Sequence, residues 1–297
     1  MSDAFKFKIY LPSKQRYYSF SEITNKDYLD IVKIISNSDD EQLLLHFNDI
    51  IYRLSGKKVI PAKISRIDSF CILINLYIVC VSNVLEITPK DQQASKLKID
   101  LYDILDKVTN FDFEYTHLLE INDDIKIKLA TPSTIYEAAP ENLITSVINT
   151  IHITGKTFNF SQFDQKQQQS LIDNISTDVT THIINKIKEI DQDYQLDVIK
   201  YGQDPPTVIT LNLYNNSMFE LLKVIYNSNL EAEYYYRYFM AKHINLPGDQ
   251  IESSTPAEIQ TYLQFYKRER KEEEKAREKA ERAQGGTVGA SPMMPGM

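Results

Sequence analysis

The chain has 297 residues, of which 42% are hydrophobic and 25% charged, and its formal net charge is -8 at pH 7. These values indicate a folded globular protein with one large or two modest hydrophobic cores, and they exclude a disordered chain. Phosphate backbones and acidic lipids bind clustered lysines and arginines, so the charge disfavours nucleic acid and lipid surfaces as ligands. The longest nearly apolar run, at 70–81, is shorter than the ~20 residues that cross a bilayer, so no membrane span is expected.

A β-hairpin is predicted at the start of the chain. Residues 6–11 alternate between polar and apolar side chains, which is the pattern of a half-buried strand. Residues 12–14 have the composition of a turn, and residues 16–20 can return as the partner strand.

Three amphipathic or apolar helices are predicted to follow the hairpin. Thr24 and Ser38 are the expected N-caps of the first two, because each precedes an acidic residue by three positions. Gly56 stands where a left-handed C-terminal cap of the second helix is expected. Ser65 is the expected N-cap of the third and most apolar helix, which should extend to about Glu86.

The middle of the chain mixes strand and helix patterns. These patterns predict strands at 111–115, 125–129 and 208–214, and helices at 140–152, 162–174 and 178–190. The first two strands are expected to form a second hairpin. A change of composition near residues 155–160 suggests a boundary between subdomains.

Two helices are predicted near the C-terminus. The first carries an apolar and aromatic stripe that begins at Leu230, and the second begins with Thr255 as N-cap and Pro256 in its first turn. From 267 to 284 the second helix loses its apolar side, so this stretch is predicted to be a solvated, charged extension. The glycine-rich stretch 285–297 is predicted to be a disordered tail.

These elements predict an α+β fold that is mostly helical, with short peripheral β-hairpins and a disordered C-terminal tail. The predicted domains are an N-terminal hairpin plus helical subdomain at 1–155, a C-terminal helical subdomain with one or two strands at 156–266, the charged helical extension at 267–284 and the tail at 285–297.

Motifs for catalysis or cofactor binding are not found in the sequence. The eight glycines are isolated or lie in the tail, so no loop is suited to cradle a phosphate. The five histidines lie far apart, and none has a neighbour at the spacing of metal ligands. The acidic residues Asp191, Asp193 and Asp197 lack the glycine and glutamate of a calcium loop, and no serine lies in a nucleophile elbow. We therefore expect no catalytic residue, no metal and no cofactor.

An aromatic helix is the positive candidate for a functional site. Residues 234–240 place aromatic side chains all round a helix, and a single face cannot bury all of them within one subdomain. Tyr, Arg and Met are enriched at the centres of protein interfaces. The pattern predicts a partner-binding surface formed by Tyr235, Tyr236, Arg237, Phe239, Met240 and the tail residues Met293 and Met294.

Other interpretations of these segments stay open. Burial of the aromatic helix on two sides in a thick core would also explain its composition. A platform for stacking nucleic-acid bases is a third interpretation, which the acidic surroundings disfavour. The charged extension is either a plain solvated face or a tether that presents the tail to a partner.

A family resemblance narrows the function. The run Ile9-Tyr10-Leu11-Pro12-Ser13, the aromatic and basic return strand, the apolar helix from Ile67 to Leu85, the hairpin that closes on residues 125–129 and the aromatic C-terminal helices resemble the baseplate hub assembly proteins of T-even-type phages, which build contractile tails. The resemblance extends over about residues 5–270. It implies a non-enzymatic assembly factor, or chaperone, for hub subunits, with hub or tail proteins as partners. It further implies residence in the host cytoplasm during assembly and leaves a place in the virion baseplate open.

Two other functions are kept as alternatives. One is a permanent structural subunit of the baseplate, which would need larger and drier interfaces than a transient factor. The remote alternative is a tail-associated hydrolase. The oligomeric state is not predicted.

Overall fold

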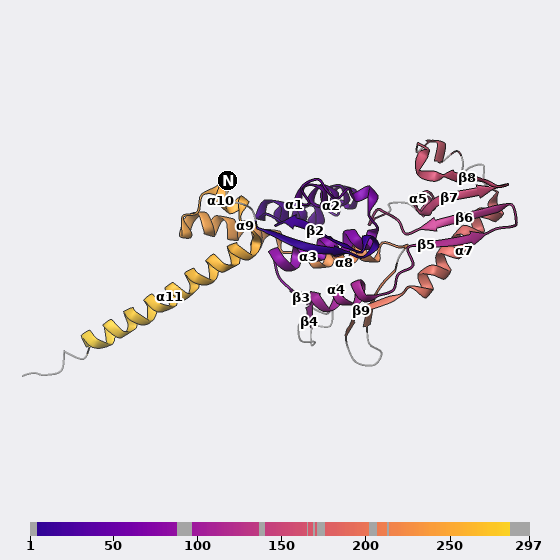
Figure 1. Ribbon diagram of the computed structural model, residues 1–297. Coiled ribbons are helices and arrows are strands. Elements are labelled where there is room, and N and C mark those ends of the chain that lie inside the picture. Colours follow the sequence, from indigo (N-terminus) through magenta and orange to yellow (C-terminus); the bar gives the residue numbers. More distant parts are fainter. Residues whose placement is uncertain are drawn as a thin grey trace, which may run out of the picture.

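The structure, a computed structural model, describes residues 5–87, 97–136, 140–164, 166–168, 170, 176–201, 207–212 and 214–285. Figure 1 shows three parts in a row: a central body, a distal sheet at one end and a C-terminal arm at the other. The helices are α1 (Asn25–Ser36), α2 (Asp40–Leu54), α3 (Arg66–Cys80), α4 (Leu101–Asn110), α5 (Pro140–Val147), α7 (Thr177–Asp193), α8 (Ser217–Tyr226), α9 (Leu230–Phe239), α10 (Gly248–Ser253) and α11 (Pro256–Gly285), with short 3-10 turns η1 (Pro12–Lys14), η2 (Pro61–Lys63) and η3 (Phe160–Gln162) and a π-helical turn η4 (Met240–Ile244).

Within the described residues, the strands form four antiparallel sheets. Three are two-stranded hairpins and one has four strands in the order β5-β6-β7-β8. The strands are β1 (Lys6–Leu11), β2 (Arg16–Ser21), β3 (Val84–Ile87), β4 (Leu97–Asp100), β5 (Thr116–Glu120), β6 (Ile125–Ala130), β7 (Ile148–Ile153), β8 (Lys156–Asn159), β9 (Leu196–Tyr201) and β10 (Thr207–Leu211). The α+β class with mostly helices and short antiparallel hairpins is confirmed.

Helix α3 lies at the centre of the body. Its residues are apolar on all sides, and a helix of this kind must be surrounded by other elements. It contacts α2, α4, α8 and the β1–β2 hairpin. The inward side chains of the hairpin, Ile9, Leu11 and Phe20, are almost completely buried, as the alternating pattern predicts.

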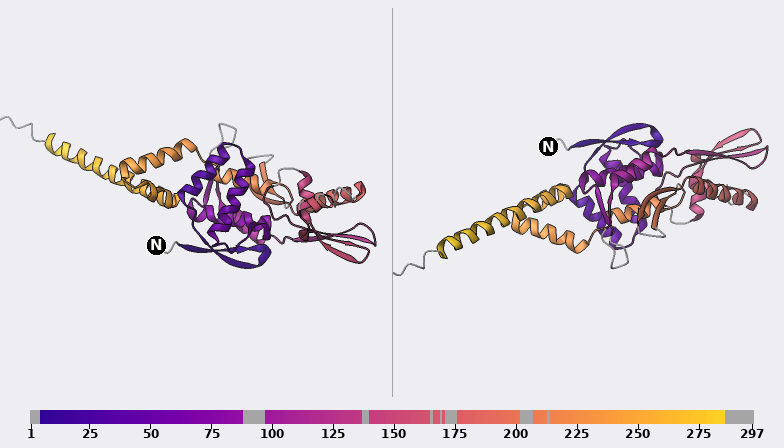
Figure 2. Two further views of the ribbon diagram at one scale, coloured as in Figure 1. Left: turned by 90° about the horizontal axis from the view of Figure 1, so that it is seen from above. Right: turned by 90° about the horizontal axis from the view of Figure 1, so that it is seen from below.

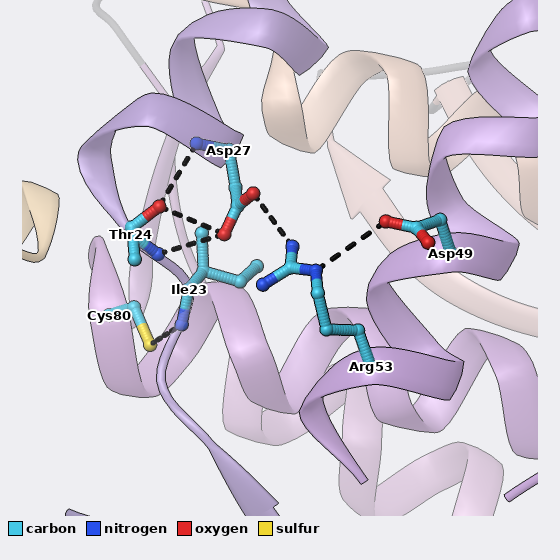
Figure 3. A network of polar contacts seen from close by, with 6 residues as sticks. All are labelled: Ile23, Thr24, Asp27, Asp49, Arg53 and Cys80. Atoms are coloured by element: carbon cyan, nitrogen blue, oxygen red, sulfur yellow. Dashed lines mark hydrogen bonds and ion pairs between the residues drawn. The ribbon is translucent and has the colours of Figure 1, made fainter. Parts of the chain in front are cut away.

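The start of α1 is tied to both α2 and α3 by polar contacts (Figure 3). Thr24 caps α1 in the predicted capping box with Asp27. The Asp27 carboxylate also accepts a hydrogen bond of 2.7 Å from Nη2 of Arg53, which lies in the last turn of α2. The backbone N–H of Ile23 lies 3.2 Å from Sγ of Cys80 at the end of α3. These contacts fix the angle at which the chain passes from the hairpin into α1.

Arg66, the first residue of α3, joins two distant segments to this helix. Its side chain is completely buried. Its Nε donates to the carbonyl of Thr134 at 3.1 Å, and its Nη1 donates to the carbonyl of Asn215 at 2.6 Å. Its backbone N–H donates to the carbonyl of Pro132 at 2.9 Å. The chain that leaves β6 and the loop that enters α8 are therefore both held at the start of α3.

Asp68 lies two residues after Arg66 on α3 and holds the turn of the first hairpin. It is completely buried, and its carboxylate accepts hydrogen bonds from the backbone N–H of Ser13 at 3.0 Å and from the Ser13 hydroxyl. It also accepts from the N–H of Ser65 at 3.1 Å, which completes the predicted capping box. One carboxylate thus caps a helix and anchors a hairpin.

The distal sheet is covered by α7 on one face. The register places Leu119, Ile127 and Ile151 side by side, and these residues belong to the same apolar cluster as Ile183 and Ile187 of α7. The helix predicted at 178–190 is therefore confirmed.

Several predicted boundaries are wrong near the first sheets and helices. Asp39 caps α2 through the N–H of Gln42, because Ser38 adopts a left-handed backbone conformation. Gly56 does have the predicted positive φ. Helix α3 ends at Cys80 and not near Glu86, because the following residues pair as β3 with the distant strand β4.

The middle of the chain departs further from the prediction. Residues 111–115 are not a strand: the strand starts at Thr116, and the rings of Phe111 and Phe113 pack 6.2 and 6.4 Å from that of Tyr194. The helix expected at 140–152 divides into α5 and β7, because β7 lies between β6 and β8 and its backbone is hydrogen-bonded on both sides. Helices α4 and α8 and strand β9 were not predicted, whereas β10 lies where the strand at 208–214 was expected.

Other expectations fall partly outside the described residues. Of the helix predicted at 162–174, residues 165, 169 and 171–174 lie outside the described residues. Of the tail predicted at 285–297, residues 286–297 lie outside them. The predicted boundary between residues 155 and 156 lies in the turn between β7 and β8, and the division into domains stays a prediction.

Replacement of Asp68 by Ala should strongly destabilise the protein. The N–H groups of Ser13 and Ser65 would lose a buried acceptor, which typically costs about 1–3 kcal/mol for each unsatisfied group. Urea denaturation followed by circular dichroism measures the loss. Asp39→Ala removes a carboxylate cap at an exposed site and should cost only about 1 kcal/mol. Equal losses in the two variants would contradict the role assigned to Asp68.

Candidate functional site

The C-terminal arm consists of α9, η4, α10 and α11, and it has a small core of its own. Met240, Ile251, Ile259 and Leu263 are buried together, and each of the elements η4, α10 and α11 contributes to this cluster. The arm is attached to the central body at α1, where the backbone N–H of Asn25 donates to the carbonyl of Ser254 at 2.6 Å. The arm is thus a helical unit that is held in place at one end.

Three of the five aromatic residues of α9 are exposed. Tyr234, Tyr235 and Tyr238 have exposed fractions of 48%, 59% and 55%, and no residue of α9 is fully buried. The interpretation of α9 as a core helix covered on two sides is therefore wrong. On α11, Phe265 is 56% exposed.

A ladder of rings runs from α9 to α11. The ring centroids of Tyr235 and Phe239 lie 6.2 Å apart, and Phe239 lies 4.7 Å from His243 and 5.0 Å from Tyr266, with its ring nearly perpendicular to that of Tyr266. Edge-to-face and tilted pairs at these separations are favourable. We call Tyr235, Phe239, His243 and Tyr266 the aromatic ladder.

Lysines of two neighbouring elements lie near a second pair of rings on α9, Tyr234 and Tyr238. The ammonium group of Lys33, on α1, lies 5.9 Å from the ring centroid of Tyr234. That of Lys242 lies 5.1 Å from the ring of Tyr238 and donates to its hydroxyl at 2.6 Å. Lysines near tyrosine rings are typical of cation–π contacts, which orient the rings while leaving much of their surface accessible.

The predicted site residues have different environments. Tyr235 is exposed, while Tyr236 and Phe239 are half-buried against the small core of the arm. Arg237 forms an ion pair with Glu252 of α10 at 2.8 Å. Met240 is completely buried, so the expectation that it offers its side chain to a partner is corrected: it stabilises the arm from inside.

Two predicted site residues belong to the tail, and three aromatic residues of the arm were not predicted. Met293 and Met294 lie outside the described residues. Tyr238, Phe265 and Tyr266 were not among the predicted site residues. Tyr234 and Tyr238 belong to the predicted apolar stripe that begins at Leu230, and the structure corrects that stripe because both are exposed. The proximity of Tyr266 to Phe239 depends on how α9 and α11 cross.

The charged extension is helical, as predicted. Helix α11 continues away from the other elements (Figures 1 and 2), and its residues from 267 to 281 are exposed. Its side chains form ion pairs along the helix, for example Arg277 with Glu281 at 2.9 Å. Exposed pairs of this kind stabilise a helix by only a few tenths of a kcal/mol each.

The described residues contain neither a metal site nor a helix that could cross a membrane. In that part of the chain no three His, Cys, Asp or Glu side chains are grouped so that they could hold a metal ion. No helix described there has the combination of length and hydropathy that a membrane crossing requires.

The comparison with protein families gives a match over residues 4–206, to the family described as T4 bacteriophage base plate protein. The match covers more than half of the chain. The chain belongs to this family. No curated protein matches the chain, and no solved structure does. The resemblance to phage baseplate proteins is thereby confirmed for the family, and the protein is a phage baseplate protein whose partners are expected in the baseplate. The C-terminal arm follows the matched region.

Replacement of Met240 by Ala should loosen the arm and leave the central body folded. Truncation of a buried Met typically costs about 2–5 kcal/mol, and the core of the arm has few other buried residues. Hydrogen exchange followed by mass spectrometry should show faster exchange in α9 to α11 and unchanged exchange in α3. Tyr235→Ala, in the same arm, should change neither. Equal effects of the two variants would contradict the assignment of Met240 to the core.

Glu233 should make the stability of the protein depend on pH. Burial raises the pKa of this carboxyl above its ordinary value of 4.5, although the Ser228 hydroxyl donates to it at 2.7 Å. The folded state therefore binds the proton more tightly than the unfolded state does, and the ionised group destabilises the protein above the raised pKa.

The variant Glu233→Gln tests this. It should melt at a slightly higher temperature than the wild-type protein at pH 7, and the difference should vanish as the pH falls to about 4.5. Glu231→Gln, an exposed residue in the same helical turn, is the matched control and should show no such rise. A lower melting temperature of Glu233→Gln at pH 7 would contradict the prediction.

Proposed function

We propose that this baseplate protein is a non-enzymatic assembly factor that binds hub subunits through the exposed rings of its C-terminal arm. The observation that carries the proposal is that tyrosines on α9 are about half exposed although the arm has an intact core beneath them. Large exposed rings are not needed to stabilise the arm, so contact with another protein best explains their exposure.

The chemistry of the exposed tyrosines of α9 suits a protein interface. Tyrosine buries a large area at low cost in side-chain entropy and keeps a hydroxyl for hydrogen bonding. Residues of this type commonly contribute about 2 kcal/mol or more to the free energy of binding when they become buried at an interface centre. Helices hold such rings in defined positions, so little order has to be gained on binding.

The membership of the baseplate family supports hub or tail proteins as the partners. The non-enzymatic part of the proposal rests on the sequence, in which glycines are isolated and histidines are not at the spacing of metal ligands. On this proposal the protein acts in the host cytoplasm while the baseplate is assembled and holds hub subunits through apolar contacts until later subunits replace it.

The double variant Tyr235→Ala, Tyr238→Ala should bind purified hub subunits at least about tenfold more weakly than the wild-type protein, because two interface rings are removed. Its circular dichroism spectrum and melting temperature should not change, since both rings are exposed. Surface plasmon resonance with immobilised wild-type or variant protein measures the affinity. Lys271→Ala, Lys275→Ala on the outer part of α11 is the control and should bind normally.

Stoichiometry separates the assembly factor from a permanent subunit. Quantitative mass spectrometry should find the protein abundant in lysates of infected cells and substoichiometric or absent in purified virions. A fixed copy number in virions would show that it is a permanent structural subunit. Unchanged binding by the tyrosine variant would show that the arm is not the docking surface.

A further inference from the structure

Two segments of the central body contain basic residues and no acidic residue. Residues 5–21 form the first hairpin and residues 55–66 join α2 to α3. Together they contain eight lysines and arginines, namely Lys6, Lys8, Lys14, Arg16, Lys57, Lys58, Lys63 and Arg66. The whole chain has a net charge of -8, so the residues outside these two segments carry a net negative charge twice as large as that of the whole chain. Both segments are therefore basic within an acidic chain.

These two segments meet in one groove of about 250 Å³. Lys14 and Arg16 line it from the hairpin, and Lys58 and Lys63 line it from the connection between α2 and α3. All four side chains are exposed, and within the described part of the chain none of them forms an ion pair with a carboxylate. Cations that are gathered in a groove produce a positive potential that attracts an anionic ligand.

We propose that this basic groove is a second docking surface, which binds an acidic segment of a partner protein that also carries aliphatic side chains. The charges would select the carboxylates and speed the encounter. Ile60 also lines the groove and is 42% exposed, so an aliphatic side chain of the partner would find an apolar contact beside the cations.

The groove suits a protein segment better than a nucleic acid. Binding of single strands relies on open aromatic faces on which bases stack. Among the described residues that line the groove, Tyr18 alone is aromatic; it is half-buried, and the guanidinium of Arg16 lies 4.6 Å from its ring centroid. This ring is already stacked, and the exposed aliphatic side chain of Ile60 has no counterpart in a nucleic acid.

The position of the groove separates it from the aromatic ladder. In both views of Figure 2 the turn of the first hairpin lies at the end of the body that faces the distal sheet, whereas α11 leaves from the opposite end. The residues of the groove also lie within the region that matches the baseplate family, and the arm follows that region. The two surfaces can therefore bind two partners at the same time.

Fluorescence anisotropy with defined peptides tests the proposal on the full-length protein. The probe is a fluorescein-labelled peptide in which Glu alternates with Ile and Ser, and the comparison peptide has Gln in place of Glu. The double variant Lys58→Glu, Lys63→Glu reverses two charges of the groove. Lys271→Glu, Lys275→Glu makes the same change of net charge on α11, where both lysines are exposed.

We expect the Glu peptide to bind the wild-type protein and the α11 variant alike, and to bind the groove variant at least about tenfold more weakly. Binding should weaken with added salt, and the Gln peptide should bind more weakly than the Glu peptide. The variant Tyr235→Ala, Tyr238→Ala should keep the affinity for the Glu peptide, which makes this test independent of the exposed tyrosines of the arm. Circular dichroism of the groove variant establishes that it is folded.

Three results would overturn the proposal. Equal weakening in the two charge-reversal variants would show a general effect of net charge. Equal binding of the Gln peptide would show that carboxylates are not recognised. Tighter binding of an oligothymidine than of the Glu peptide, lost in the groove variant, would show that the groove is a nucleic-acid site.

Discussion

The buried first turn of α3 is the constraint on which the rest of the structure depends. Arg66 and Asp68 carry charges at positions without solvent contact, and such groups are tolerated only when hydrogen bonds replace water. Asp68 meets this requirement with the hairpin turn at Ser13, and Arg66 meets it with the carbonyls of Thr134 and Asn215. The hairpin, the distal sheet and α8 are thus positioned by one helical turn.

This turn also determines the position of the two surfaces to which we assign binding. The hairpin brings Lys14 and Arg16 to the connection that carries Lys58 and Lys63, and the basic groove forms where they meet. The arm is attached to the body through α1 and extends from the end opposite the distal sheet. Charges that act over a distance and rings that act on contact have complementary roles in assembly, since the former raise the rate of encounter and the latter slow dissociation.

Local patterns of the sequence predicted the elements that local chemistry controls. The alternation of residues 6–11 and the capping boxes at Thr24, Ser65 and Thr255 are all present, because a cap or a turn is formed by residues three or four positions apart. Strand β7 was predicted as a helix because its apolar residues also fit a helical period, and only pairing with β6 and β8 distinguishes the two. The aromatic helix was recognised from composition alone.

By itself the sequence determined the class of fold, the capped helices, the aromatic helix and the resemblance to baseplate proteins, since each depends on the order of neighbouring residues. Only the tertiary structure decided that Met240 is buried while Tyr235 is exposed, because that depends on which face of α9 meets α10 and α11. The basic groove was hidden for the same reason. The two segments that form it lie far apart in the chain, in a protein whose net charge is negative, and they meet where Asp68 holds the hairpin turn at the start of α3.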